Sequence, residues 1–212
     1  WKLNSGCYSF NWPLESLPSE CPSENNGCVA FGIDATLAEI NAEVATTWAR
    51  ILFAVPDSLL LVRDHDLQNE DNVSHMMDLF GNFGVAQRVE VISAGDRGEF
   101  LHEVDVLLTT FPFARPYAAA QALSYGIPVI AFDAPGNVCQ DVAFLLQRLE
   151  LDKRMLGQSN DAYIEQAITW ARDEEARSAF RKDGRQALTS SPVFDPASFT
   201  ASLEEAYRGI WE

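Results

Sequence analysis

Short apolar runs alternate along the chain with longer stretches in which apolar residues recur every three or four positions. The apolar runs predict five buried strands, at 28–33, 58–62, 88–92, 104–109 and 127–132. The helical spacing predicts helices at about 40–55, 70–80 and 117–125, and a helical region beyond residue 138. Asp195 precedes a proline at the first helical position, which predicts where the last helix begins.

Continuous apolar strands that alternate with amphipathic helices are typical of a parallel sheet covered on both faces. We therefore predict an α/β fold, a doubly wound and Rossmann-like domain over residues 27–212, with ligands at the carboxyl ends of its strands. Residues 1–26 are rich in Ser, Pro, Glu and Asn. This composition predicts an extended linker that lays a few apolar side chains, among them Phe10, on a neighbouring surface.

The charge balance narrows the possible partners. The 212 residues include 31 acidic and 15 basic side chains, a formal net charge of -16. A nucleic acid or an anionic lipid surface requires clustered positive charge, so we expect neither as a partner. No stretch approaches the roughly 20 apolar residues that cross a bilayer, and no signal peptide is recognisable. These observations predict a cytoplasmic protein without a membrane partner.

The sequence lacks the usual motifs for phosphate, metal or nucleophilic chemistry. The loop from Gly32 to Glu39 has one glycine and two carboxylates, so it does not carry the glycine-rich dinucleotide fingerprint. The four cysteines match no common zinc spacing, and we favour reduced thiols over a metal site or a disulfide. His65 stands between two aspartates and is interpreted as part of a solvated loop. We predict no metal site and no catalytic residue.

Three arginines could meet an anion at the carboxyl ends of the strands. They are Arg63, Arg97 and Arg115. An exposed arginine commonly has no role beyond the surface, and that alternative stands for each of them. The residues alone thus indicate an α/β domain without a defined activity.

The order of several segments is more informative than any one of them. These segments are 29–40, 48–61, 104–113, 122–129 and 190–211. Together they resemble the O-GlcNAc transferase and SPINDLY family, glycosyltransferase family 41. The resemblance implies a GT-B architecture in which this chain is the C-terminal lobe, which holds a nucleotide-sugar donor without a metal or other cofactor. It also implies an upstream catalytic lobe and tetratricopeptide repeats that bind the acceptor protein.

The chain departs from the family pattern where the donor would bind. The family's lysine that neutralises the donor diphosphate is replaced by Glu39, which reverses the sign of the interaction. A family run rich in Asn, Gly and Thr reads here as Ala-Arg-Pro-Tyr-Ala-Ala-Ala over 114–120. The aspartate that contacts the ribose is replaced by Gln121, another aspartate by Thr109, and a Ser-Arg pair by residues 139–140.

Three interpretations follow from a scaffold that is kept and a site that is altered. The first is a glycosyltransferase lobe that uses a UDP-linked sugar through changed contacts. Its candidate binding residues are Arg63, Arg97, Arg115, Tyr117 and Gln121. The second is a catalytically inactive lobe that acts in protein interaction. The third is a nucleotide-binding Rossmann domain of unrelated ancestry.

Overall fold

The computed structural model describes residues 9–10, 20–64, 66–93, 95–133, 140–184, 188 and 191–211. Its strands are β1 (Val29–Asp34), β2 (Ser58–Asp64), β3 (Val89–Ser93), β4 (Val106–Leu108), β5 (Val129–Phe132) and β6 (Leu156–Gly157). The larger helices are α2 (Ala42–Ala54), α3 (Glu70–Gly81), α5 (Pro116–Ser124), α6 (Asp141–Arg148), α8 (Asn160–Arg172) and α11 (Pro196–Trp211). The shorter helices are α1 (Pro22–Asn26), α4 (Arg97–His102), α7 (Asp152–Met155) and α9 (Glu174–Ala179).

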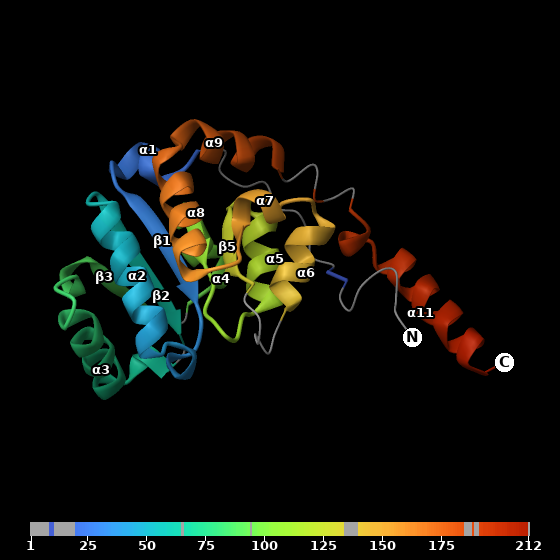
Figure 1. Ribbon diagram of the computed structural model, residues 1–212, viewed down its shortest axis with the longest axis horizontal. Helices are drawn as coiled ribbons and strands as arrows, with labels where there is room; N and C mark the ends of the chain where they lie inside the picture. The colour runs from blue at the N-terminus through green and yellow to red at the C-terminus, as the bar shows by residue number, and fades with distance from the viewer. Residues whose placement is uncertain are drawn as a thin grey trace.

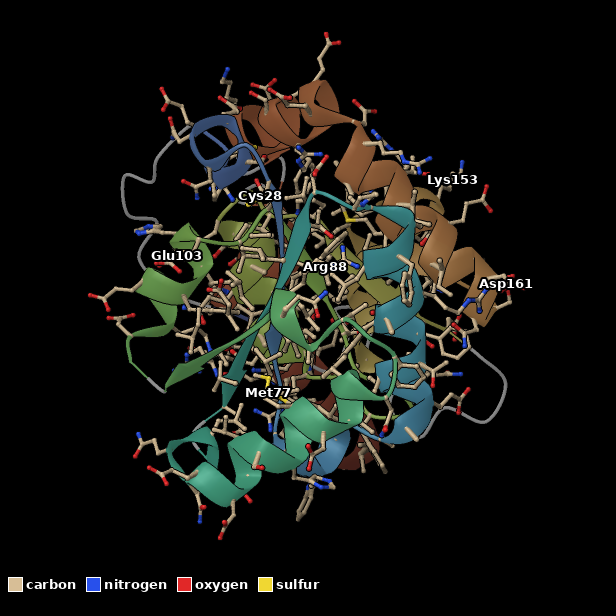
Figure 2. The ribbon with its side chains drawn as sticks, turned by 90° about the vertical axis from the view of Figure 1, so that its left-hand side faces the viewer. Cys28, Met77, Arg88, Glu103, Lys153 and Asp161 are labelled. Atoms are coloured by element: carbon tan, nitrogen blue, oxygen red, sulfur yellow. The ribbon has the colours of Figure 1, made fainter. Side chains whose placement is uncertain are left out.

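The described strands form one parallel sheet in the order β3-β2-β1-β4-β5-β6. This is the doubly wound order, and the direction of winding reverses between β1 and β4. Helix α2 packs against α3 and α8, whereas α5 packs against α6. In Figure 2, Asp161 on α8 lies on one side of the sheet and Glu103, after α4, lies on the other. The predicted fold is confirmed.

The sheet has one strand more than the apolar runs predict. The additional strand, β6, lies in the region predicted to be helical. Its two residues pair with β5, Leu156 with Ala131 and Gly157 with Phe132. A two-residue strand is too short to produce a detectable period. Gly157 is needed there, since a Cβ would lie 2.5 Å from the backbone nitrogen of Tyr163.

The N-terminal segment contains a helix where an extended linker is predicted. Helix α1 begins with Pro22 at its first position, and Glu24 forms a capping box with the backbone of Cys21. The proline therefore starts a helix here rather than interrupting one. Phe10 is buried, as predicted, and its N–H donates to the carbonyl of Val193 at 3.0 Å. The boundary near residue 26 remains a prediction.

Helix α11 extends away from the sheet (Figure 1). Asp195 accepts hydrogen bonds from the backbone N–H groups of Ala197 and Ser198, both at 3.1 Å, so the predicted start is confirmed. None of the residues of α11 is buried, and its last apolar residue, Trp211, is 93% exposed. No described helix is both long and apolar enough to cross a membrane.

Candidate functional site

Polar side chains gather at the carboxyl ends of β1 and β2, beside the point where the winding of the sheet reverses. Asp34 is the last residue of β1, and the strand register places Arg63 of β2 opposite it. Because these strands are parallel, side chains at their carboxyl ends share one edge of the sheet. In open α/β sheets this edge is where ligands bind.

Asp34 is the centre of this cluster. Its carboxylate is buried and forms ion pairs with Arg63, at 3.3 Å between Nη1 and Oδ1, and with Arg97. The Nη2 group of Arg63 also donates to the carbonyl of Gly95 at 2.8 Å. Among these three side chains, one carboxylate thus neutralises one of two guanidinium groups, which leaves one positive charge in excess of Asp34.

The guanidinium of Arg97 connects this cluster to α5. Its central carbon lies 5.3 Å from the centre of the Tyr117 ring, a cation–π arrangement. Its Nη1 lies 3.5 Å from Oε1 of Gln121, one turn further along the helix. The Tyr117 ring is 51% exposed and also meets Phe10 edge-on, with the ring centres 6.4 Å apart. Arg97 therefore ties β1, α4 and α5 together at the strand ends.

Arg115 is paired with a second carboxylate. Its Nε lies 3.0 Å from Oε2 and 3.2 Å from Oε1 of Glu39. Glu39 ends a 3₁₀ turn (Leu37–Glu39), and its Oε2 accepts the backbone N–H of Thr36 at 2.8 Å. Asp64 accepts the N–H of Leu37 at 2.7 Å, which fixes the start of the same turn.

Tyr163 of α8 contacts the backbone directly after β4. Its hydroxyl donates to the carbonyl of Thr109 at 2.9 Å and accepts from Nε1 of Trp48 at 3.3 Å. Both aromatic side chains are fully buried. This contact fixes the backbone from which the loop to α5 departs.

Stability at high pH is expected to depend on Tyr163. Burial raises the pKa of its phenol above the ordinary value of 10.0, and its hydrogen bonds offset only part of that effect. The unfolded chain therefore loses this proton first, and stability present at neutral pH falls as the pH rises above about 10. From this residue we expect almost no slope below about pH 9 and a slope that approaches about 1.4 kcal/mol per pH unit above about pH 10, measured by urea unfolding between about pH 8 and 11. A Tyr163→Phe variant with an equally steep slope would contradict this assignment.

The structure brings four of the predicted site residues into one cluster, namely Arg63, Arg97, Tyr117 and Gln121. The fifth, Arg115, lines a small cavity of about 10 Å³ that Asp34 also lines. The sequence did not identify Asp34 as the partner of two arginines. Its position directly after the first buried strand was the available signal.

The cysteines that the structure describes do not join this arginine cluster. Cys21 is buried and Cys28 half-buried, both as free thiols, and burial raises the pKa of Cys21 to about 11. Within the described ranges, no group of three or more His, Cys, Asp or Glu side chains could hold a metal ion. Cys7, His65 and Cys139 lie outside these residues.

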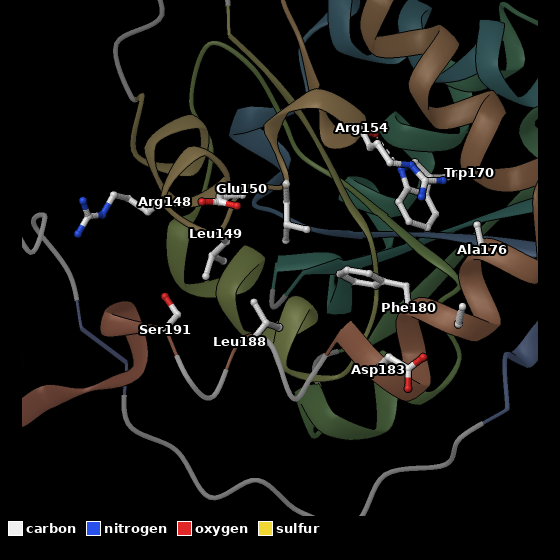
Figure 3. Close-up of a pocket in the computed structure, with 12 residues that line it drawn as sticks. Arg148, Leu149, Glu150, Arg154, Trp170, Ala176, Phe180, Asp183, Leu188 and Ser191 are labelled. Atoms are coloured by element: carbon white, nitrogen blue, oxygen red, sulfur yellow. Dashed lines mark hydrogen bonds between the residues drawn. The ribbon is translucent and has the colours of Figure 1, made fainter.

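A cavity of about 610 Å³ lies elsewhere, around Trp170 and Phe180 (Figure 3). Trp170 is near the end of α8, and Leu149, which also lines this cavity, follows α6. Both helices begin after the carboxyl end of a strand, so their C-terminal ends lie near the amino ends of the strands. The cavity is therefore separate from the arginine cluster.

Comparison with known proteins identifies the scaffold. No family model matches the sequence. The chain is 30% identical over 210 residues to a probable UDP-N-acetylglucosamine–peptide N-acetylglucosaminyltransferase SPINDLY from Petunia hybrida, covering 97% of this chain and 22% of that protein. An O-GlcNAc transferase mutant from Thermobaculum terrenum superposes with a TM-score of 0.84 at 31% identity, over 95% of this chain and 39% of that one. The resemblance to the SPINDLY and O-GlcNAc transferase family is confirmed.

The O-GlcNAc transferase-like chain spans about a fifth of the length of the curated SPINDLY proteins it matches. Its sheet and flanking helices match those of GT-B glycosyltransferase structures. Anabaena HepE, in complex with UDP-glucose, has the same fold, with a TM-score of 0.65 at 15% identity over 94% of this chain and 56% of that one. The chain is therefore a glycosyltransferase-like domain.

Proposed function

We propose that this chain is the donor-binding lobe of a nucleotide-sugar-dependent glycosyltransferase that modifies protein, with a UDP-linked sugar as donor. One observation carries the proposal: Arg63, Arg97, Tyr117 and Gln121 come from three separate elements and meet at the carboxyl ends of the strands. The names of the SPINDLY relatives, UDP-N-acetylglucosamine–peptide N-acetylglucosaminyltransferases, support a UDP-sugar donor and a peptide acceptor.

Each of these residues suits a different part of such a donor. Arg63 and Arg97 keep one excess positive charge over Asp34, which suits a phosphate group. The half-exposed Tyr117 ring offers a face for a nucleobase, and Gln121 offers an amide for a sugar hydroxyl. We assign no catalytic residue to this chain. Proton transfer and acceptor binding belong, in this proposal, to an upstream lobe and tetratricopeptide repeats in the cytoplasm.

Nucleotide binding tests this proposal directly. Titration calorimetry with UDP, UDP-GlcNAc and GDP-fucose is expected to give measurable binding of the uridine nucleotides. Arg97→Ala is expected to weaken UDP binding about tenfold or more, because a hydrogen bond to a charged group contributes about 1.5–3 kcal/mol.

Arg50→Ala is the matched control, since it removes the same charge from an exposed ion pair with Asp161 on α2 and α8. Equal UDP affinity in Arg97→Ala and Arg50→Ala would refute the placement of the site. An Arg115→Ala variant, in the same assay, measures how much Arg115 contributes to the affinity for UDP.

A second candidate function is a non-catalytic domain that acts through protein contact. It is favoured by one specific observation: each of the three arginines is already paired with a carboxylate of this chain, Asp34 or Glu39. If no nucleotide binds while thermal unfolding shows an intact fold, this second function is the better account.

A further inference from the structure

The carboxylate of Glu39 stands where an anionic ligand group would meet Arg115. Arg115 immediately precedes α5, and its side chain makes no capping hydrogen bond to that helix. Instead its Nε faces both carboxylate oxygens of Glu39, at 3.0 and 3.2 Å. The Glu39 side chain is 20% exposed and that of Arg115 is 35% exposed, so water screens this pair only in part.

Glu39 is held in place by more than its ion pair. The backbone N–H of Thr36 donates to Oε2 at 2.8 Å, which fixes the carboxylate to its own turn. Asp64 in turn fixes that turn to the end of β2 through the N–H of Leu37. The carboxylate is therefore preorganised beside Arg115 and does not depend on Arg115 for its position.

The cavity on the inner side of Arg115 is too small for a phosphate group. The cavity lined by Asp34, Thr109, Arg115 and the start of α5 has a volume of about 10 Å³. That volume holds about one water molecule. A phosphate that approaches Arg115 therefore comes from the solvent side, where the carboxylate of Glu39 already faces the same guanidinium.

We infer that Glu39 is an internal competitor for the second phosphate of the donor. The inference rests on the proposed nucleotide site and names the residue that limits its affinity. The first phosphate meets Arg63 and Arg97, which retain one excess positive charge. The second meets an arginine that is already neutralised and a fixed carboxylate of like charge. The second phosphate therefore adds no affinity while Glu39 is charged.

The test compares UMP with UDP by titration calorimetry on the wild-type chain, Glu39→Gln and Glu43→Gln. Glutamine keeps an oxygen that can accept the Thr36 N–H, so the turn is preserved, and thermal unfolding verifies this. Glu43→Gln removes one charge from an exposed position in the first turn of α2 and serves as the charge-matched control.

In the wild type, the affinities for UMP and UDP are expected to agree within about threefold. Glu39→Gln is expected to raise the UDP affinity about tenfold or more, because Arg115 becomes free to bind the second phosphate. UMP affinity should change by less than about threefold, and Glu43→Gln should leave both affinities near those of the wild type.

The failures of the two proposals are distinguishable. If the ratio of UDP to UMP affinity is the same in the wild type and Glu39→Gln, the inference is overturned and the nucleotide site stands. If neither nucleotide binds to any variant, the proposed function is overturned and the inference falls with it. UDP binding that appears only in Glu39→Gln supports the inference about Glu39 and contradicts the proposed function of the wild-type chain.

Discussion

Replacing Asp34 with alanine is expected to lower the free energy of unfolding by about 3–5 kcal/mol. The Asp34 side chain is 4% exposed and is the ion-pair partner of both Arg63 and Arg97. Without this carboxylate, two guanidinium groups at the carboxyl ends of the strands lose their shared partner and repel each other. Urea unfolding of the wild type and the variant measures the difference.

The exposed Arg50–Asp161 ion pair provides the control for Asp34. It is 2.8 Å long, and its side chains are 52% and 82% exposed. Asp161→Ala should therefore change stability by no more than about 0.5 kcal/mol. Inorganic phosphate should stabilise Asp34→Ala more than the wild type, because it can replace the lost carboxylate. A loss below about 1 kcal/mol, without a greater response to phosphate, would contradict the role assigned to Asp34.

Asp105→Ala is expected to lower the free energy of unfolding by a similar amount, about 3–5 kcal/mol. Asp105 directly precedes β4, at the amino ends of the strands. Asp105 is 1% exposed, and its carboxylate accepts three hydrogen bonds. The donors are the Ser23 hydroxyl at 2.8 Å, the Ser23 N–H at 3.2 Å and the Ala30 N–H at 2.9 Å. These bonds attach α1 to the start of β1.

Two buried arginines increase the cost of losing Asp105. Arg177 donates to the Ser23 hydroxyl at 3.2 Å, and Arg181 donates to the carbonyl of Val104 at 2.6 Å. Burial lowers the pKa of Arg181, and the charge of Asp105 acts in the opposite direction. Removing this carboxylate leaves the arginines with less compensating charge inside the fold.

The nearby Glu103 is the control for Asp105. It follows α4, is exposed, and should tolerate alanine within about 0.5 kcal/mol. Asp105→Asn keeps one acceptor oxygen and should lie between the wild type and Asp105→Ala in urea unfolding. An Asp105→Ala variant as stable as Glu103→Ala would show that the network around Ser23 is unimportant.

The class of fold was predictable because buried parallel strands are continuous apolar runs. β2 and β5 are typical, since most of their residues are buried and the others are partly buried. The two residues of β6 were not predictable, because Leu156–Gly157 has no period and is a strand only through its pairing with β5. Helix α1 was also missed, since its proline indicates a break in an extended segment as readily as a first helical residue.

The cationic residues of the candidate site could be predicted from the sequence. The carboxylates with which they pair could not. Arg63, Arg97 and Arg115 stand near strand ends or helix starts, and this position can be read from the sequence. Which carboxylate each one meets depends on the strand order and on how the loops fold over the sheet edge. The ion pair of Glu39 with Nε of Arg115 joins two loops that are distant in sequence. The sequence indicated only that a carboxylate replaces a cation there.

The most direct test of a nucleotide site at this edge is a crystal structure of the chain grown with UDP. The account predicts the first phosphate within about 3 Å of the guanidinium groups of Arg63 and Arg97, with the uracil against Tyr117. It also predicts that the Glu39–Arg115 pair stays closed in the wild-type chain, with the second phosphate not bound by Arg115. UDP bound in the cavity around Trp170, or anywhere away from the carboxyl ends of β1 and β2, would contradict the account.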